Sequence, residues 1–317
     1  KGFEEAPQSF HFLQIAAPIF LLILTRLRMP VSTTFILLTS FAASPAAVGK
    51  VLAKSMSGYV LAFFLGLIQG LTEFLPVSSS GHLEIFKKIF GDVYTPQESF
   101  LLTLSLHFAT AISTIIVFRK DIIIIFKELF QFKKNKSFYF SIYIVISMLP
   151  AAFIGLFYED FINDLFNGNL ILVGSMLVLT SFLLFQTDRK KINEKKISYI
   201  SALLIGIVQA IAILPGLSRS GTTIAVAIII GVNREKASRF SFLMVIPLII
   251  GGMIKNLLSF PQNFEIKADV LFIGFFSALI TGVFACKLMI ALVNKSKLKY
   301  FGLYCLIVGL ISIYYVI

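Results

Sequence analysis

Long apolar runs are the feature that most constrains this chain. Six runs approach the ~20 residues that a helix needs to cross ~30 Å of hydrocarbon. They cover residues 101–118, 138–157, 170–185, 240–257, 270–293 and 300–317. Charged residues make up only 14% of the 317, whereas a soluble domain carries roughly 25%. We therefore predict an all-α polytopic membrane protein and exclude a soluble domain.

Two further apolar regions, Met56–Phe90 and Ile197–Val232, are interrupted by proline, serine and glycine. The interruptions read PVSSSG at residues 76–81 and PGLSRSG at residues 215–221. Polar, helix-breaking backbone is tolerated at membrane depth only where it is buried in protein or lines a wet cavity. We interpret both regions as re-entrant helix–loop–helix segments.

The two interrupted regions also resemble each other. GLIQ at residues 66–69 matches GIVQ at residues 206–209, and Ser79 and Ser218 each lie three residues past a proline. We predict an inverted repeat in residues 56–317, because each half then has one re-entrant segment and an odd number of transmembrane helices, three. Such repeats place the site at their interface.

The predicted halves are residues 56–196 and 197–317 of one membrane domain. Residues 1–55 precede it as an extra N-terminal hydrophobic segment to which the sequence gives no role.

Basic residues fit this topology. The net charge is +12, and in a soluble protein that would suggest nucleic acid. Here the basic residues gather in the segments 119–136, 189–196, 234–239 and 295–299. The predicted repeat places all four on one side, which the positive-inside rule assigns to the cytoplasm. We expect membrane lipids as partners, and no nucleic acid.

The first interruption carries the strongest candidate site. Gln69 and Glu73 are four residues apart and share one helix face. An ionisable residue at membrane depth is a functional hypothesis by default. The alternative is a solvated carboxylate at the interface, which the neighbouring serines 78–80 and His82 make less favoured.

The second interruption carries a candidate anion site. Backbone N–H groups at a helix start, hydroxyls and a guanidinium bind phosphate well. The residues are Ser218, Arg219, Ser220 and Thr223. The alternative is that Arg219 snorkels to lipid headgroups. Together, the two loops suit phosphoryl transfer from an ester or anhydride whose tail lies in lipid.

These motifs resemble a known family. QGLTEFLPVSSSGH at residues 69–82 and PGLSRSGTT at residues 215–223 are similar to the two signatures of the bacterial undecaprenyl-diphosphate phosphatase family, the bacitracin-resistance type. The resemblance runs from about Met56 to the C-terminus. It implies a multi-pass enzyme of the bacterial inner (plasma) membrane that hydrolyses undecaprenyl diphosphate to undecaprenyl phosphate and inorganic phosphate. This recycles the lipid carrier for cell-wall synthesis.

The resemblance also implies roles for residues. Ser79 would be the nucleophile, with Glu73, His82 and Arg219 in the active site. The family needs a divalent cation, Mg²⁺ or Ca²⁺, and Glu73 could hold it with Gln69 nearby. Ser218, Ser220, Thr223 and Gln69 complete the predicted phosphate-binding set. His107 is a departure, since many relatives carry Gln there.

Three readings compete with this one. A transporter or flippase of a polyprenyl phosphate would use the same inverted-repeat site. The membrane phosphatases with a histidine nucleophile need a histidine after their Ser-Arg pair, and no histidine follows His107. A non-enzymatic scaffold is the third reading. The sequence leaves open whether His82 or Glu73 is the base, which cation binds, and whether the protein forms a homodimer.

Overall fold

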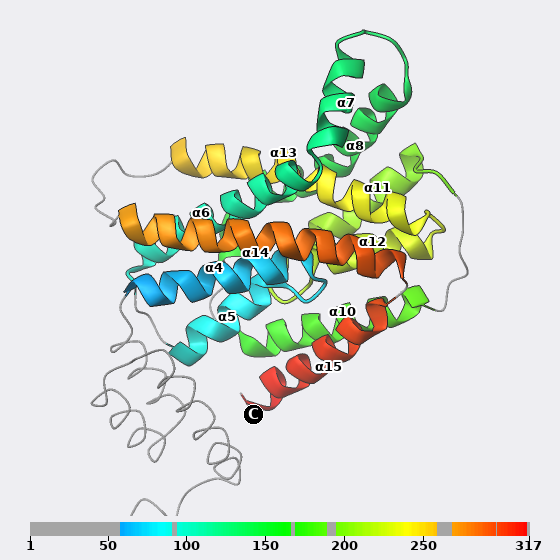
Figure 1. The fold of residues 1–317 in the computed structure, drawn as a ribbon. Coiled ribbons are helices and arrows are strands. Elements are labelled where there is room, and N and C mark those ends of the chain that lie inside the picture. The colour runs from blue at the N-terminus through cyan, green and yellow to red at the C-terminus, as the bar shows by residue number, and fades with distance from the viewer. Residues whose placement is uncertain are drawn as a thin grey trace, which may run out of the picture.

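The computed structural model describes residues 58–90, 94–165, 169–188, 195–258, 268–295 and 297–315. Over these residues the named secondary-structure elements are all helices (Figure 1). In chain order they are α4 (Gly58–Phe74), α5 (Ser79–Phe90), α6 (Pro96–Val117), α7 (Arg119–Leu129), α8 (Lys136–Phe157), α9 (Glu159–Leu165), α10 (Leu170–Asp188), α11 (Tyr199–Ile211), α12 (Arg219–Ile229), α13 (Arg234–Leu258), α14 (Ala268–Asn294) and α15 (Leu298–Tyr314). The N-terminal segment 1–55 lies outside the described residues.

The predicted spans are present as helices. Among the described residues, five helices are long and apolar enough to cross a membrane: α6, α8, α10, α13 and α14. The sixth apolar run forms α15, which has 17 residues and is shorter than the other five. Over the residues that the structure describes, the fold is therefore that of a helical, multi-pass membrane protein, as predicted.

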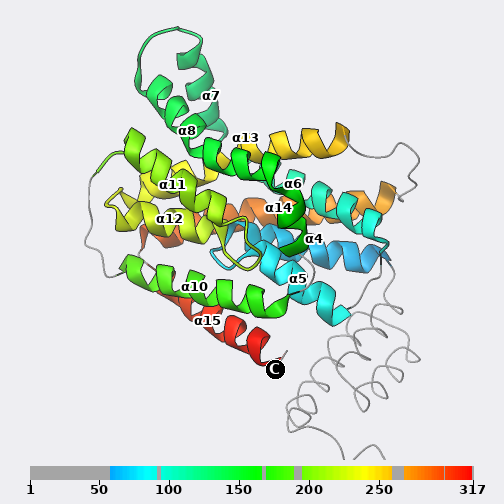
Figure 2. The ribbon, with the colours of Figure 1, turned by 180° about the vertical axis from the view of Figure 1, so that it is seen from behind.

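Each interrupted region forms two helices joined by a turn. Residues 75–78 join α4 to α5, and residues 212–218 join α11 to α12. The two turns touch each other. A Cβ added to Gly81 would lie 2.9 Å from the Cα of Gly216, and one added to Gly221 would lie 3.0 Å from the Cβ of Pro76. Both turns lie inside the helical body (Figure 2).

Glycines set the closest contacts between long helices. Helix α4 packs against α14, and α11 packs against α8. A Cβ on Gly66 would lie 2.3 Å from the carbonyl oxygen of Gly274, and one on Gly206 would lie 2.6 Å from that of Ser147. Small residues let helix backbones approach in this way, and they are typical of membrane interfaces. These two contacts hold the broken helices against the spans.

Candidate active site

Helix α4 supplies a buried carboxylate. Glu73 lies one residue before the end of the helix and is 8% exposed, while Gln69, one turn earlier, is fully buried. Gln69 Nε2 donates a hydrogen bond of 3.0 Å to Glu73 Oε2. The prediction that these two residues share one face is confirmed.

The turn after α4 presents three serines in different ways. Ser78 has φ +70°, a left-handed conformation that favours glycine. Its Oγ accepts the Gly81 N–H at 3.2 Å and caps α5. Ser79 Oγ instead donates a hydrogen bond of 2.7 Å to Glu73 Oε2. Ser78 is thus occupied with the fold, whereas Ser79 faces the carboxylate.

The turn before α12 also has a serine that caps the helix, but it is not the serine pair that proline spacing matched. Ser218 Oγ accepts the Gly221 N–H at 3.1 Å and caps α12. The structural counterpart of Ser218 is therefore Ser78, not Ser79, because Gly216 adds one residue between the proline and the cap. Ser79 and Arg219 then occupy equivalent places, each as the first residue of its helix.

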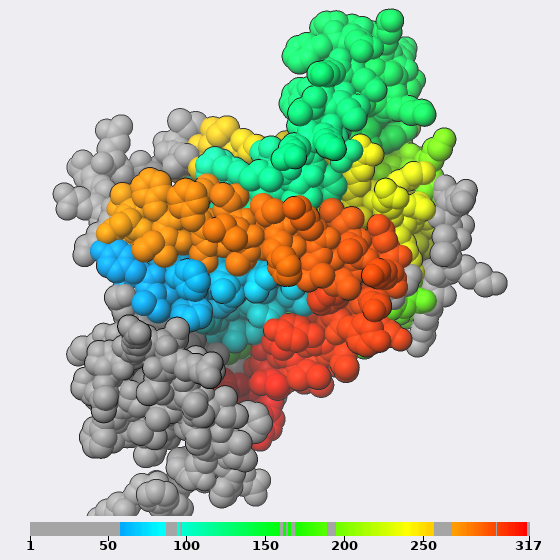
Figure 3. All heavy atoms as spheres, viewed as in Figure 1, coloured from blue at the N-terminus to red at the C-terminus, as the bar shows by residue number. Residues whose placement is uncertain are grey.

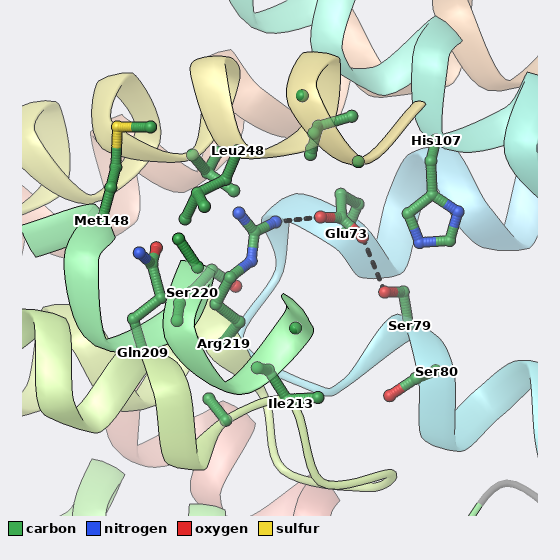
Figure 4. A pocket seen from close by; sticks show the side chains of 18 of the residues that line it. Glu73, Ser79, Ser80, His107, Met148, Gln209, Ile213, Arg219, Ser220 and Leu248 are labelled. Carbon is green, nitrogen blue, oxygen red and sulfur yellow. Dashed lines mark hydrogen bonds and ion pairs between the residues drawn. The ribbon is translucent and has the colours of Figure 1, made fainter. Parts of the chain in front are cut away.

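Glu73 joins the two halves. Arg219 Nη2 donates to Glu73 Oε1 in an ion pair, while Ser79 and Gln69 donate to Oε2. A buried carboxylate needs such compensation, because an uncompensated charge away from water is costly. Figure 4 shows Arg219 and Ser79 approaching Glu73 from opposite sides.

His82 has different partners from those expected of a base for Ser79. Its Nδ1 lies 2.8 Å from the Ser78 carbonyl oxygen, and its Nε2 lies 2.7 Å from the Tyr304 hydroxyl. The two rings are stacked, with centroids 5.6 Å apart. In this arrangement His82 ties the serine turn to α15. Its catalytic role stays a prediction.

The predicted phosphate ligands separate into two groups. Ser218, Arg219 and Ser220 line a cavity of about 590 Å³ together with Glu73 and Ser79. Thr223 and Gln69 are not among its lining residues. The Thr223 hydroxyl donates to the Arg219 carbonyl oxygen at 2.7 Å and contacts Ser241 Oγ at 2.6 Å. Thr223 therefore supports the start of α12 from behind.

Sequence patterns predicted no role for several polar residues of this cavity, among them His107, Gln209 and Lys255. His107 on α6 faces Glu73 and Ser79, and its Nδ1 lies 2.9 Å from the Thr103 carbonyl oxygen (Figure 4). Gln209 on α11 is 2% exposed, and its Oε1 has no hydrogen-bond partner. Two sequence features could have indicated the first two: His107 departs from the family pattern, and Gln209 matches Gln69 in the internal repeat.

A further wall of the cavity comes from two spans and is mainly apolar, although the charged Lys255 of α13 is among its residues. Helix α8 contributes Met148 and Leu156, and α13 contributes Leu248 and Ile249. Gly251 also lies on this wall, and a Cβ added there would meet nothing within 4 Å. The cavity thus has a charged end between the turns and an apolar side between α8 and α13.

The donor set suits a hard cation only in part. Among the described residues there is no group of three or more His, Cys, Asp or Glu that could hold a metal ion. The Gln69 Oε1 is buried without a hydrogen-bond partner, one turn from the Glu73 carboxylate. Amide and carboxylate oxygens are the ligands that Mg²⁺ and Ca²⁺ prefer, and Mg²⁺ commonly takes the others from water and substrate phosphates. Gln69 and Glu73 therefore offer oxygens of the type that such a cation takes, while both Glu73 oxygens already accept protein donors.

The fold and the cavity define a class: a multi-pass helical membrane protein whose carboxylate, hydroxyl and guanidinium meet in a partly apolar cavity. Residues 62–311 match the family model described as Bacitracin resistance protein BacA. The chain belongs to that family.

Relatives support this assignment. The chain is 52% identical over 257 residues to an undecaprenyl-diphosphatase of Christiangramia forsetii, covering 80% of this chain and 96% of the relative. It is 45% identical over 254 residues to an undecaprenyl-diphosphatase of Bacteroides thetaiotaomicron, covering 78% and 96%. An undecaprenyl-diphosphatase of Methanococcus vannielii is 40% identical over 255 residues, covering 80% and 98%.

Proposed function

We propose that this protein hydrolyses undecaprenyl diphosphate to undecaprenyl phosphate and inorganic phosphate. The names of the relatives favour this activity over transport or flipping of a polyprenyl phosphate. The observation that carries the proposal is the position of Glu73, which binds a hydroxyl from one turn and a guanidinium from the other. A carboxylate, a nucleophile and an anion ligand are the parts that phosphoryl transfer needs.

Ser79 is the proposed nucleophile. A serine hydroxyl is a weak nucleophile until a base takes its proton. The hydrogen bond of 2.7 Å from Ser79 to Glu73 favours Glu73 over His82 for that task. The Ser79 oxygen attacks the terminal phosphorus, its proton passes to Glu73, and the bond to the lipid phosphate breaks. Glu73 passes this proton to the leaving lipid phosphate. Water then attacks the phosphorus of the phosphoserine and gives a proton to Glu73, which returns it to the Ser79 oxygen as inorganic phosphate leaves.

Arg219 is the proposed ligand of the transferred phosphate. A guanidinium binds phosphate oxygens as a planar, bidentate donor. Its present partner, Glu73, lies in the same cavity, so Arg219 needs only to exchange one anion for another. Ser218 and Ser220 lie beside it at the start of α12, where backbone N–H groups favour an anion.

Glu73, with Gln69 nearby, is proposed to hold a divalent cation, Mg²⁺ or Ca²⁺. When bound, it neutralises charge on the diphosphate. Glu73 would orient the cation through its carboxylate, and Gln69 would contribute its unpartnered Oε1. That the protein forms a homodimer stays a prediction.

The apolar wall between α8 and α13 suits the lipid tail. A substrate with a charged head and a long hydrocarbon tail requires a site that is polar at one end and apolar along its side. Met148, Leu248 and the open space at Gly251 provide that side. The head would then reach Arg219 while the tail leaves toward lipid.

We also infer an inverted repeat in the bacterial inner membrane. The packing supports it: α4 of the first half lies on α14 of the second, and α11 of the second lies on α8 of the first. The helix α10 lies on α15, its counterpart in the other half. Exchanged partners of this kind fit two halves related by a pseudo-twofold axis.

Phosphate release from purified protein tests the activity. Wild type should release inorganic phosphate from undecaprenyl diphosphate in detergent, where no membrane separates two compartments. A transporter would release none. Absence of release across the tested divalent cations would overturn the proposal.

A further inference from the structure

Helix α7 and the turn after it stand clear of the helical body (Figure 3). The segment 119–135 joins α6 to α8, and both of these helices are long and apolar enough to span a membrane. It must therefore lie where two spans end, at the boundary between lipid and water. No residue of α7 is buried.

The exposed surface of this segment is apolar to an unusual degree. Phe126 is 57% exposed, Phe130 74% and Phe132 91%. Ile123 and Ile124 are each about half exposed. Exposed aromatic rings at the end of a helix are costly in water, and they suit the headgroup layer of a bilayer.

The backbone at the tip presents Phe132 outward. Its φ is +52°, a conformation that bulky residues rarely adopt. The two turns of the cavity use a similar conformation at Ser78 and Gly216, where the backbone is packed tightly. At Phe132 no such packing accounts for it, because the side chain is almost fully exposed.

Basic residues are frequent in the same segment. The segment and the first residue of α8 carry six: Arg119, Lys120, Lys127, Lys133, Lys134 and Lys136. Only two acidic residues accompany them, and one of these, Asp121, is paired with Arg239 of α13 at 2.6 Å. A basic and apolar surface is complementary to an anionic bilayer surface.

We call α7 together with the turn at residues 130–134 the basic tip. We propose that the basic tip binds the surface of an anionic bilayer. Phe130 and Phe132 insert among the headgroups, and Lys133 and Lys134 contact the lipid phosphates. This interaction is separate from the proposed hydrolysis, since the cavity includes no residue of the basic tip.

A fluorescent probe at the basic tip tests the proposal. The protein with Phe132→Cys is labelled with an environment-sensitive dye and reconstituted in vesicles of phosphatidylcholine alone or with phosphatidylglycerol. Native Cys286 and Cys305 are fully buried, so labelling is selective. In anionic vesicles the emission should shift to the blue and quenching by acrylamide, a neutral water-soluble quencher, should be largely lost. Nitroxides on the lipid should quench the probe.

Charge variants distinguish the basic tip from a general effect of charge. Each lysine near an anionic surface shifts the equilibrium between the bound and the free state of the basic tip about fivefold. Lys133→Gln with Lys134→Gln should restore acrylamide quenching, whereas Lys295→Gln with Lys297→Gln, at another basic segment, should not.

Two outcomes would overturn the proposal. Strong acrylamide quenching of equal extent in both vesicle types would place the basic tip in water. Self-quenching that grows with the protein-to-lipid ratio would show that a second copy of the chain covers it. Neither outcome bears on phosphate release, so the proposed hydrolysis is judged independently.

Discussion

The two turns at the centre of the molecule share a scaffold but carry different chemistry. Ser78 and Ser218 each cap a helix by accepting the N–H of a glycine three residues later. The next residue is Ser79 in one turn and Arg219 in the other. Four residues after the matched glutamines 69 and 209 stand Glu73 and Ile213. The two turns thus share the serine cap, while the reactive side chains differ between the halves.

This division explains why a single carboxylate contacts both turns. Glu73 binds Ser79 within its own half and Arg219 across the interface. Its counterpart, Ile213, lines the same cavity without charge. Substitutions at matched positions of the two halves therefore test whether this division of roles holds.

The largest effect is expected at the serines. Ser79→Ala should lower turnover by about 10³-fold or more, because removal of a covalent nucleophile costs at least that much. Ser78→Ala should mainly lower stability, by about 1 kcal/mol, since it removes a helix cap. Phosphate release and thermal unfolding separate the two. Mass spectrometry of enzyme quenched during turnover should find phosphate on the peptide that contains Ser79. Turnover of Ser79→Ala above a few per cent of wild type would exclude covalent catalysis by this serine.

The second largest effect on turnover is expected at the ion pair between Glu73 and Arg219. Glu73→Gln and Arg219→Lys should each lower turnover about 10²–10³-fold, the usual cost of losing a preorganised electrostatic contact. Both variants should still insert in the membrane. Ile213→Val, at the uncharged counterpart of Glu73, is the matched control and should keep most activity. Near-wild-type turnover in either charged-site variant would remove these residues from the active site.

The packing glycines should affect stability rather than chemistry. Gly66→Ala and Gly206→Ala each force a Cβ against a backbone carbonyl, and overpacking typically costs 1–3 kcal/mol. Gly251→Ala meets open space and should be neutral or slightly stabilising. The unfolding temperatures of the three variants in detergent test this. If Gly206→Ala alone is tolerated, the two contacts are not equivalent.

The smallest effect is expected outside the repeat. Deletion of residues 1–55 should leave hydrolysis largely intact, because the turns and the cavity lie downstream of it. Phosphate release by the truncated protein, measured against the full chain, tests this. Loss of activity in a truncated protein that still folds and inserts would make this segment part of the catalytic unit.

Periodicity and motif spacing predicted much of this architecture. Apolar runs locate spans because lipid leaves the backbone few alternatives. The broken helices followed from proline and glycine at residues 76, 81, 215 and 216. The pairing of Glu73 with Gln69 followed from helix geometry.

Tertiary contacts decided what the sequence could not. The extra residue Gly216 shifted the alignment of the turns, so Ser79 corresponds to Arg219 rather than to Ser218. His82 lies only three residues from Ser79, yet its ring binds Tyr304 of α15, a contact that spacing along the chain cannot reveal. His107 reaches the cavity from α6 for the same reason.

The ion pair between Glu73 and Arg219 has a consequence for the order of assembly. The two residues are 146 positions apart, and a ribosome adding about 5–20 residues per second needs roughly 7–30 s to cover that distance. Helix α4 waits longer still, because α14, against which it packs, is made near the end. The carboxylate of the first half is thus inserted well before its counter-charge exists. A nascent chain that stalls between the halves would hold this acid in its broken helix with Gln69 and Ser79 as hydrogen-bond donors but without the positive charge of Arg219.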